Sequence, residues 1–305
     1  MVDISIIVCT LNRAGSLENT LASVADAIRN VPNAEVEVVL VNNSSTDNTQ
    51  DVIESWAELM QFQVKPILES RKGLSFARNT AVAYSSGKIL VFTDDDCTLN
   101  GDYLVRMLEH YERDSEPVIR GGRVELGDPT DQPFSILLGD QTLRRTDLTS
   151  LGGFIIGANM TMAREVFKSV GLFDTRFGAG AIFMAGEDTD FIYRAHRAGI
   201  PVEYVPDMIV KHFHGRKDRS SIDSLNYGYT ISEGAIYAKH IRDVKLLKHF
   251  YWNCRKWVRG LATGHHLYDE TFGVTYTTLI RNTVKGMALY GAYTLCVRKQ
   301  RKLSS

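Results

Sequence analysis

Apolar runs alternate with amphipathic segments along the first third of the chain. The short apolar runs have the length of strands, and the longer segments between them have the apolar spacing of helices. The runs are apolar throughout rather than at alternate positions, which is typical of parallel strands buried on both faces of a sheet. An α/β fold is therefore predicted. Its first strands are 4–9, 36–41, 64–68 and 89–93, and its first helices are 17–28, 49–60 and 76–84.

Polar residues follow three of these predicted strands. The first strand is followed by residues 10–13, the second by residues 42–47 and the fourth by residues 94–96. In open α/β sheets, ligands bind beyond the carboxyl ends of the strands. We expect these three segments to meet at one edge of the sheet and to form a binding site there.

The rest of the chain has a different pattern. Its middle third is rich in turns and predicts mixed strands and loops. A boundary near Gly215 is predicted, which separates a first domain of residues 1–215 from a helical extension of residues 216–305. The helical patterns of the extension are 222–240, 244–260 and 277–297.

Composition narrows the classes of function. With 305 residues, of which 44% are hydrophobic and 23% charged, the chain is an ordinary globular protein large enough for an enzyme. The formal net charge of −1 argues against a dedicated nucleic-acid binder. Four scattered cysteines predict neither a zinc site nor a disulfide framework, and they favour a reducing compartment. No apolar run reaches the roughly 18–20 residues of a membrane span.

Three consecutive carboxylates, Asp94, Asp95 and Asp96, follow the predicted strand 89–93. Like charges this close repel each other and raise one another's pKa unless a cation lies between them. Mg²⁺ or Mn²⁺ is the expected cation, because both favour carboxylate oxygens and share their coordination with substrate phosphates. A solvated acidic turn that caps the next helix would have the same sequence, and the triplet alone leaves both interpretations open.

Six short segments together carry a resemblance to a known family. They are residues 5–13 (SIIVCTLNR), 41–47 (VNNSSTD), 73–79 (GLSFARN), 94–96 (DDD), 186–190 (GEDTD) and 205–212 (VPDMIVKH). In this order they resemble the family 2 glycosyltransferases. The resemblance implies the GT-A fold and the transfer of a sugar from a nucleotide diphosphate to an acceptor. It also implies a nucleotide-binding half, residues 1–97, and an acceptor-binding half, residues 98–215.

The resemblance implies a metal site on the donor diphosphate. Asp94 and Asp96 occupy the outer positions of the family's Asp-x-Asp motif, which implies that they hold Mn²⁺ or Mg²⁺. Asp95, in the variable middle position, is expected to face the donor ribose or sugar. His212 aligns with a histidine that completes the metal shell in some relatives. A bound metal stabilises the charge that grows on the departing diphosphate.

Further nucleotide contacts are implied by the same resemblance. Thr10, Asn12 and Arg13 match the family's first nucleotide-contact loop, although a loop that caps the next helix explains them equally well. Asn42 stands where the family usually has an aspartate for the base, so a UDP-sugar is expected but another nucleotide stays open. Arg78 belongs to the Ala-Arg-Asn segment near the nucleotide. Its guanidinium suits either a contact near the ribose or a structural pair with carboxylates.

On the acceptor side, Asp188 is implied as the general base that removes the proton of the attacking hydroxyl. Glu187 would orient neighbouring groups and contact the acceptor, and Asn159 matches an acceptor-side segment of the family. The alternatives are an acidic first turn of a helix for Glu187 and Asp188, and a strand-end amide bonded to backbone for Asn159. A carboxylate opposite the leaving group implies inversion at the anomeric carbon.

Residues 241–305 carry twelve Lys and Arg against three Asp and Glu. The aromatic residues Tyr251, Trp252 and Trp257 lie among these cations, and Arg298, Lys299, Arg301 and Lys302 follow near the end. This pattern suits peripheral contact with an anionic membrane. It also suits a helical packing element or a homodimer contact whose aromatic residues are buried, and both interpretations stay open.

The sequence therefore predicts an inverting, metal-dependent glycosyltransferase with a C-terminal helical extension. It would act in the cytoplasm, free or at the inner face of the membrane, on a nucleotide-sugar donor and a glycan or lipid-linked acceptor. A sugar nucleotidyltransferase is one alternative, but residues 10–15 lack the Gly-rich triphosphate loop that such an enzyme needs. A catalytically silent binding or scaffold protein is the other, and the carboxylates Asp94, Asp96 and Asp188 count against it.

Overall fold

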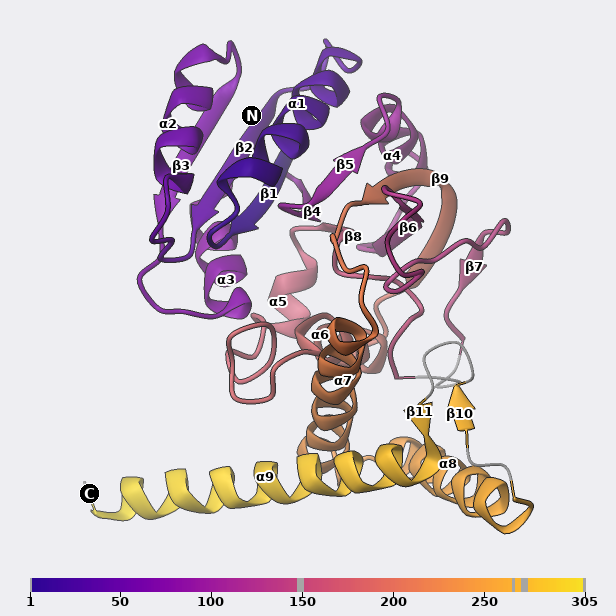
Figure 1. Ribbon diagram of the computed structural model, residues 1–305. Helices are drawn as coiled ribbons and strands as arrows, with labels where there is room; N and C mark the ends of the chain where they lie inside the picture. Colours follow the sequence, from indigo (N-terminus) through magenta and orange to yellow (C-terminus); the bar gives the residue numbers. More distant parts are fainter. Residues whose placement is uncertain (1, 147–150, 265–266, 270–273, 304–305) are drawn as a thin grey trace. The chain divides into compact units, whose positions relative to one another are not determined.

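The computed structural model describes residues 2–146, 151–264, 267–269 and 274–303 (Figure 1). The chain forms two compact units. The first consists of Met1–Thr146, Gly152–Thr175 and Glu187–Lys217, and the second of Asp147–Leu151, Arg176–Gly186 and Asp218–Ser305. The segment Arg176–Gly186 therefore packs with the C-terminal helices, although it lies between two segments of the first unit in the sequence.

A mixed sheet of nine strands forms the centre of the first unit. The strands are β1 (Ile4–Thr10), β2 (Val36–Asn42), β3 (Gln63–Leu68), β4 (Ile89–Asp94), β5 (Cys97–Leu99), β6 (Ile119–Leu126), β7 (Leu143–Arg144), β8 (Asn159–Ala163) and β9 (Val202–His212). Their order is β3-β2-β1-β4-β8-β6-β9-β5, and β7 pairs with β9. The pairs β1–β2, β1–β4, β2–β3 and β6–β9 are parallel, whereas the pairs made by β5, β7 and β8 are antiparallel.

Helices cover both faces of this sheet. Against one face pack α1 (Ala14–Arg29), α2 (Thr49–Leu59) and α4 (Tyr103–Tyr111), and against the other α3 (Leu74–Tyr84), α5 (Val166–Val170) and α6 (Glu187–Arg197). Strand β1 is apolar at successive positions because its side chains point alternately to opposite faces of the sheet, and both faces are buried. Ile4, Ile6 and Val8 belong to one core, whereas Ile7 belongs to the other.

The second unit contains α7 (Arg219–Lys239), α8 (Val244–Ala262), α9 (Tyr276–Leu303) and the short strands β10 (Leu267–Asp269) and β11 (Val274–Thr275). Helices α7 and α9 approach each other closely. A Cβ atom at Gly234 would lie 2.1 Å from the carbonyl oxygen of Thr283, and one at Gly286 would lie 2.1 Å from that of Ile231. Glycine is required at both positions because any side chain would collide with the facing backbone.

The segment Arg176–Gly186 packs onto α9 through aromatic contacts. The ring of Phe183 lies 5.6 Å from that of Tyr290, and the Arg176 guanidinium lies 5.0 Å from the centre of the same tyrosine ring. These contacts join a loop from the middle of the chain to its C-terminal helix.

The predicted α/β class is confirmed, and the predicted elements match the observed ones closely. The predicted helix 17–28 is Ala14–Arg29, and the predicted helix 244–260 is Val244–Ala262. The turn-rich middle third contains the strands β6, β7 and β8, as its pattern of mixed strands and loops indicated, but it also contains the helices α4, α5 and α6. In the part of the chain that the structure describes, no helix has the length and apolar character needed to cross a membrane.

Candidate active site

Three loops meet at the carboxyl edge of β1, β2 and β4, as the sequence predicted. The backbone N–H of Asn12 donates to Ser45 Oγ at 2.9 Å, and the backbone N–H of Thr46 donates to Asn12 Oδ1 at 2.7 Å. Arg13 reaches the third loop, where its Nη2 lies 3.3 Å from Asp96 Oδ2. Asn12 has a φ of 54°, a left-handed conformation that asparagine tolerates better than most residues.

Asn42, the predicted base contact, is almost fully buried. Its Oδ1 accepts the backbone N–H of Ser45 at 2.8 Å, and its Nδ2 donates to Gln50 Oε1 at 2.8 Å. The side chain therefore closes the turn that follows β2. Thr10 is also buried, and its carbonyl accepts the backbone N–H of Asn43. Contact of Thr10 or Asn42 with a nucleotide stays a prediction.

The first two carboxylates of the triplet face different arginines. Asp94 Oδ1 lies 3.2 Å from Arg78 Nη2, whereas Asp95 Oδ1 lies 3.9 Å from Arg13 Nε. Burial raises the pKa of Asp94, although the charge of Arg78 opposes this. Burial also raises the pKa of Asp95, to about 6. Both groups therefore hold a proton more readily than an exposed aspartate does.

The pKa of Asp96 is shifted in the opposite direction, because the partners of this carboxyl are cationic. Burial would raise its pKa, but the hydrogen bond and charge of His212, with the charges of Arg13 and Arg216, hold the pKa below its ordinary value. The same contact acts on the imidazole: burial would lower the pKa of His212, but the hydrogen bond and charge of Asp96 raise it. Asp96 is the carboxylate of the triplet that is most firmly ionised.

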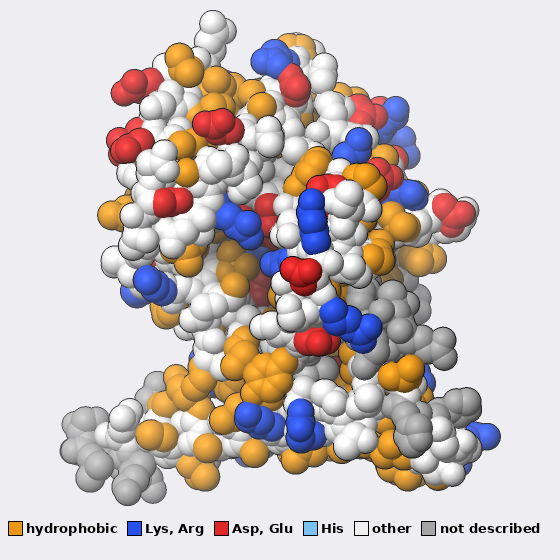
Figure 2. All heavy atoms as spheres, in the orientation of Figure 1, with side chains coloured by type: hydrophobic (Ala, Val, Ile, Leu, Met, Phe, Trp, Pro, Cys, Tyr) orange, Lys and Arg blue, Asp and Glu red, His pale blue; other side chains and the backbone are white. Residues whose placement is uncertain are grey.

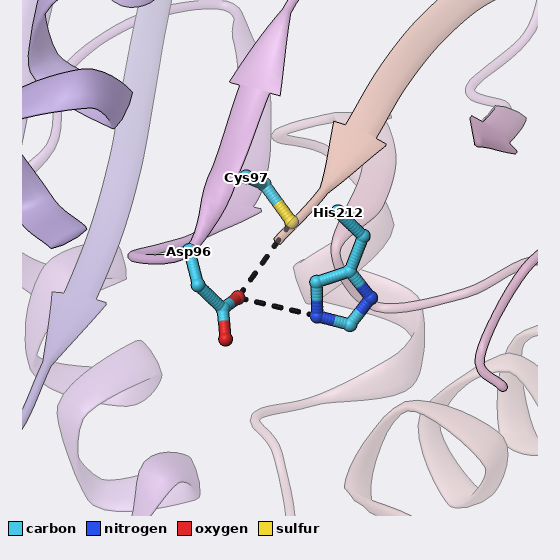
Figure 3. Close-up of side chains that lie close together, drawn as sticks. All are labelled: Asp96, Cys97 and His212. Atoms are coloured by element: carbon cyan, nitrogen blue, oxygen red, sulfur yellow. Dashed lines mark hydrogen bonds and ion pairs between the residues drawn. The ribbon is translucent and has the colours of Figure 1, made fainter. Parts of the chain in front are cut away.

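Asp96, Cys97 and His212 form a compact group with one ligand atom each (Figure 3). These atoms lie within 4.8 Å of one another, and all three residues are buried. His212 Nε2 lies 3.2 Å from Asp96 Oδ1, and Cys97 is the direct partner of His212 in the pairing of β5 with β9. Carboxylate and imidazole suit a divalent ion such as Mn²⁺, and the thiol adds a softer donor. The residues present therefore fit a metal ion.

Arg78 connects the triplet to Glu187 at the start of α6. Its Nη2 lies 3.2 Å from Asp94 Oδ1, and its Nη1 lies 3.0 Å from Glu187 Oε1. Its Nη2 also donates to the carbonyl oxygen of Gly157 at 3.3 Å. The side chain is only 3% exposed. The structure thus contains the carboxylate pairs that were one of the two interpretations of Arg78, and a contact near the ribose stays a prediction.

Glu187 and Asp188 begin helix α6. Burial and the neighbouring charge of Asp188 raise the pKa of Glu187, against the charge of Arg78. Asp188 is half-buried, and its Oδ2 accepts the backbone N–H of Gly157 at 3.0 Å. The acidic first turn of a helix is therefore present, and it also brings both carboxylates within reach of the Arg78 cluster.

Asn159 lies inside the fold rather than at a surface. The side chain is fully buried, and its Nδ2 donates to the carbonyl oxygens of Arg123 and Met208 at 3.0 and 2.8 Å. Its Oδ1 accepts the hydroxyl of Tyr103 at 2.7 Å. These contacts match the alternative interpretation of Asn159, a strand-end amide bonded to backbone. In the described conformation, no polar atom of the Asn159 side chain is available to an acceptor.

Comparison with known proteins identifies the family. The family model described as "Glycosyl transferase family 2" matches residues 5–171, which is more than half of the chain. The chain belongs to glycosyl transferase family 2. The prediction made from the six segments is therefore confirmed.

Two relatives of this family 2 member are matched over 210 residues. The succinoglycan biosynthesis protein ExoM of Rhizobium meliloti is 31% identical, over 67% of this chain and 64% of ExoM. The glycosyltransferase AglE of Haloferax volcanii is 25% identical, over 68% of this chain and 66% of AglE. The matched region thus spans somewhat less than two thirds of either relative.

Solved structures confirm the GT-A fold of this family 2 member. The mannosyltransferase PcManGT from Pyrobaculum calidifontis, in complex with GDP-Man and Mn²⁺, aligns with a TM-score of 0.59 and 18% identity, over 99% of this chain and 80% of PcManGT. The TarS 1–349 structure from S. aureus aligns with a TM-score of 0.56 and 17% identity, over 77% of this chain and 64% of the TarS chain.

Two residues near the site were not predicted from the sequence of this family 2 member. Cys97 directly follows the triplet, and its place opposite His212 depends on the pairing of β5 with β9. Arg216 is close enough to Asp96 to lower the pKa of that carboxyl. Its position four residues after His212 was the only available signal, since a cation near predicted metal ligands suits a diphosphate.

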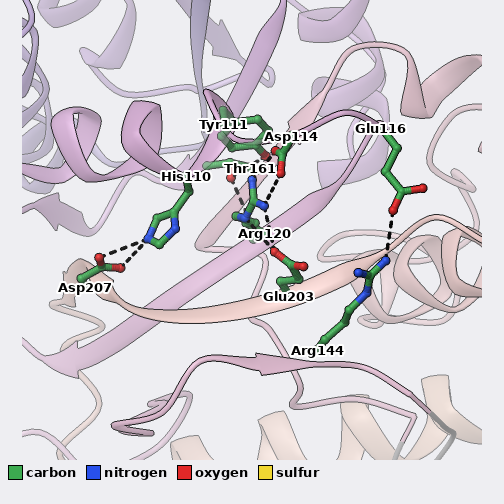
Figure 4. Close-up of polar contacts among 9 residues, drawn as sticks. All are labelled: His110, Tyr111, Asp114, Glu116, Arg120, Arg144, Thr161, Glu203 and Asp207. Atoms are coloured by element: carbon green, nitrogen blue, oxygen red, sulfur yellow. Dashed lines mark hydrogen bonds and ion pairs between the residues drawn. The ribbon is translucent and has the colours of Figure 1, made fainter.

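A second buried arginine lies away from these carboxylates (Figure 4). Arg120 Nη1 lies 2.5 Å from Asp114 Oδ2, and its Nη2 lies 2.9 Å from Glu203 Oε2. The guanidinium also stacks 4.9 Å from the centre of the Tyr111 ring. Arg120 and Glu203 are near the starts of β6 and β9, whereas His212 ends β9. The Arg120 cluster is therefore structural and offers a comparison for Arg78.

Proposed function

We propose that this family 2 member is an inverting glycosyltransferase that moves a sugar from a nucleotide diphosphate donor to a glycan or lipid-linked acceptor. One observation carries the proposal: the buried Arg78 contacts both Asp94 of the triplet and Glu187 of the Glu-Asp pair. Asp188 adjoins the same cluster through Gly157. Carboxylates from segments far apart in the sequence thus lie at one site.

The donor side of the proposed site uses the loops after β1, β2 and β4. Asp96 and His212 would hold the divalent ion, with Asp94 as a further candidate ligand. The ion, when bound, would stabilise the negative charge of the departing nucleoside diphosphate. Support for an ion comes from the buried group of Asp96, Cys97 and His212 and from the Mn²⁺ in the PcManGT complex. Arg13 is 39% exposed and could contact the phosphates while it holds Asp96.

On the acceptor side, Asp188 is the proposed general base. It accepts the proton of the acceptor hydroxyl, whose oxygen forms a bond to the anomeric carbon as the bond from that carbon to the diphosphate oxygen breaks. Attack from the face opposite the leaving group inverts the anomeric centre. Glu187 is the proposed positioning residue, because its contact with Arg78 orients the start of α6.

A UDP-sugar is the proposed donor. TarS structures contain UDP or UDP-GlcNAc, whereas the PcManGT structure contains GDP-Man, so the fold accepts either base. ExoM is named for succinoglycan biosynthesis, and the poly-beta-1,6-N-acetyl-D-glucosamine synthase of Staphylococcus epidermidis is 23% identical over 210 residues. Both names support a saccharide acceptor. The scattered cysteines favour a reducing compartment, which supports action in the cytoplasm.

The test is transfer and hydrolysis with a panel of UDP- and GDP-sugars, with and without Mn²⁺. We expect Asp188→Asn to lower kcat by about 10²- to 10⁴-fold, the usual contribution of a general base, and to leave donor affinity within about threefold of the wild type. Asp207→Asn is the matched control, because Asp207 contacts His110 on the surface. Unchanged turnover in Asp188→Asn would disprove the assignment of the base.

The same panel, with a nucleoside triphosphate and a sugar phosphate added, distinguishes the two alternatives. A nucleotidyltransferase would release pyrophosphate from a nucleoside triphosphate and a sugar phosphate. A silent binding protein would turn over no donor in the presence of any tested metal.

A further inference from the structure

Helix α8 (Val244–Ala262) in the second unit has three distinct faces. One face is packed inside the unit and contains the buried residues Leu246, Trp257 and Gly260. These positions recur at helical spacing, so they lie along one side of the helix. Twelve of the other sixteen residues of the helix are exposed.

The second face is apolar and exposed. Val244 is 76% exposed and Val258 62%, and each lies about two turns from Tyr251, which is 57% exposed. Leu247 and Leu261 lie beside them and are also exposed. The spacing of 244, 247, 251, 258 and 261 places these residues in one strip along the helix. Exposed apolar surface that is contiguous marks an interaction site more often than isolated residues do.

The third face is basic. It consists of five exposed cations, Lys245, Lys248, Arg255, Lys256 and Arg259. Helix α8 contains no Asp or Glu, so nothing within the helix neutralises them. Trp252 lies among them, 52% exposed, with the Arg255 guanidinium 5.5 Å from the centre of its ring. Figure 2 shows apolar and basic side chains next to one another on the helices of the second unit.

From these three faces we infer that α8 docks the protein on a phospholipid bilayer with an anionic surface. The apolar strip enters the headgroup region, where valine, leucine and tyrosine lose contact with water. The adjacent cations meet lipid phosphates, and the Trp252 ring suits the interface between water and acyl chains. The inference goes beyond the proposed transfer reaction, because no residue of the candidate active site takes part.

Charge favours a lipid surface over a second copy of the chain. A symmetric contact through α8 would place the same surface on both sides. Five cations would then face five cations with no carboxylate of either helix between them, and like charges at close range repel. An anionic bilayer supplies the missing negative charge and also accepts the apolar strip. The side chains of Arg298, Lys299, Arg301 and Lys302 lie outside the described residues, and the inference does not use them.

The experiment is flotation of the full chain with vesicles, in the absence of any donor. One set of vesicles is phosphatidylcholine alone, and the other contains about 30% phosphatidylglycerol. We expect binding to the anionic vesicles at 50 mM NaCl, a loss of most binding at 500 mM NaCl, and little binding to phosphatidylcholine. Because catalysis is not measured, failure of the glycosyltransferase proposal would leave this result unaffected.

Two variants separate the contributions of the faces. Lys248→Gln/Arg255→Gln is expected to weaken partitioning about 25-fold, at about fivefold for each cation near an anionic surface. Val244→Ser/Val258→Ser is expected to weaken it by about tenfold through lost apolar burial. The matched controls are Arg113→Gln/Lys168→Gln, with the same charge change, and Leu59→Ser/Leu172→Ser, with similarly exposed side chains. Both controls are expected to bind as the wild type does.

Several outcomes would overturn the inference. They are an absence of binding to anionic vesicles at low salt, equal losses in the α8 variants and their controls, and retention of full binding by both α8 variants. Sedimentation velocity tests whether α8 binds a second copy of the chain. If the protein does not float with vesicles but forms a dimer that both α8 variants dissociate, this surface serves self-association instead. Thermal unfolding midpoints within about 2 °C of the wild type show that the variants are folded, since surface changes usually have small effects.

Discussion

Replacement of Arg78 by methionine tests the link between the two carboxylate groups. Methionine keeps much of the side-chain length and removes the charge, so Asp94 and Glu187 lose their shared cation. Removal of one partner from a buried ion pair typically costs about 3–5 kcal/mol, because a charge stays in the interior without compensation. Arg78 is only 3% exposed and Glu187 only 9%, so the loss belongs at the upper part of this range at pH 8.

The loss is expected to depend on pH. Glu187 and Asp94 already have raised pKa values in the folded protein, which means that folding favours their protonated forms. The free-energy cost of ionising these carboxyls in the folded protein is absent below their ordinary pKa. It grows as the pH rises towards the folded pKa. Without Arg78 the folded pKa values rise further. At pH 5 the carboxyls take up protons, and each pH unit below the new pKa recovers about 1.4 kcal/mol per group.

The assay is urea unfolding of Arg78→Met and the wild type at pH 5 and pH 8, with turnover measured at pH 8. Arg120→Met is the matched control, because Arg120 is also buried, at 6% exposed, between two carboxylates. Both variants should lose stability, but only Arg78→Met should lose donor turnover. A loss of less than about 1 kcal/mol in Arg78→Met, or one that is equal at pH 5 and pH 8, would refute the proposed role of Arg78.

Three further predictions concern single residues. Glu37 is fully buried, and the hydrogen bonds of Lys65 and Ser5 outweigh burial and lower the pKa of Glu37 to about 2. Glu37→Gln should therefore cost about 3 kcal/mol of stability at pH 7 and progressively less as the pH falls from 4.5 towards 2. Urea unfolding measures this loss. His212→Gln should weaken Mn²⁺ binding by about 10- to 100-fold in calorimetry, and unchanged affinity would remove His212 from the metal site. Asn42→Asp should shift nucleotide preference towards UDP in a thermal-shift panel. It should cost about 1–3 kcal/mol of stability, because the contact that accepts the Ser45 N–H is kept but the buried donation to Gln50 is lost. An unaltered order of nucleotides would show that Asn42 does not read the base.

The sequence alone determined the elements and the edge of the sheet at which the site forms. Apolar runs without alternation predicted strands buried on both faces, and β1 confirms this with neighbouring residues in two different cores. The position of the polar segments after β1, β2 and β4 predicted their convergence, which the contacts of Asn12 and Arg13 confirm. Such features depend on residues close in sequence, where side-chain period and strand direction decide the outcome.

Only the tertiary structure decided which side chains contact one another across these segments. Arg78 and Glu187 are 109 residues apart, and no local pattern distinguishes a nucleotide contact from an ion pair at that separation. The same holds for Asn159, which is buried among backbone carbonyls, and for Cys97, which reaches His212 through strand pairing. In α8 the sequence placed Trp252 and Trp257 among the same cations, but the structure buries Trp257 and exposes Trp252. Packing decides these differences, because the register between elements determines which neighbours a side chain meets.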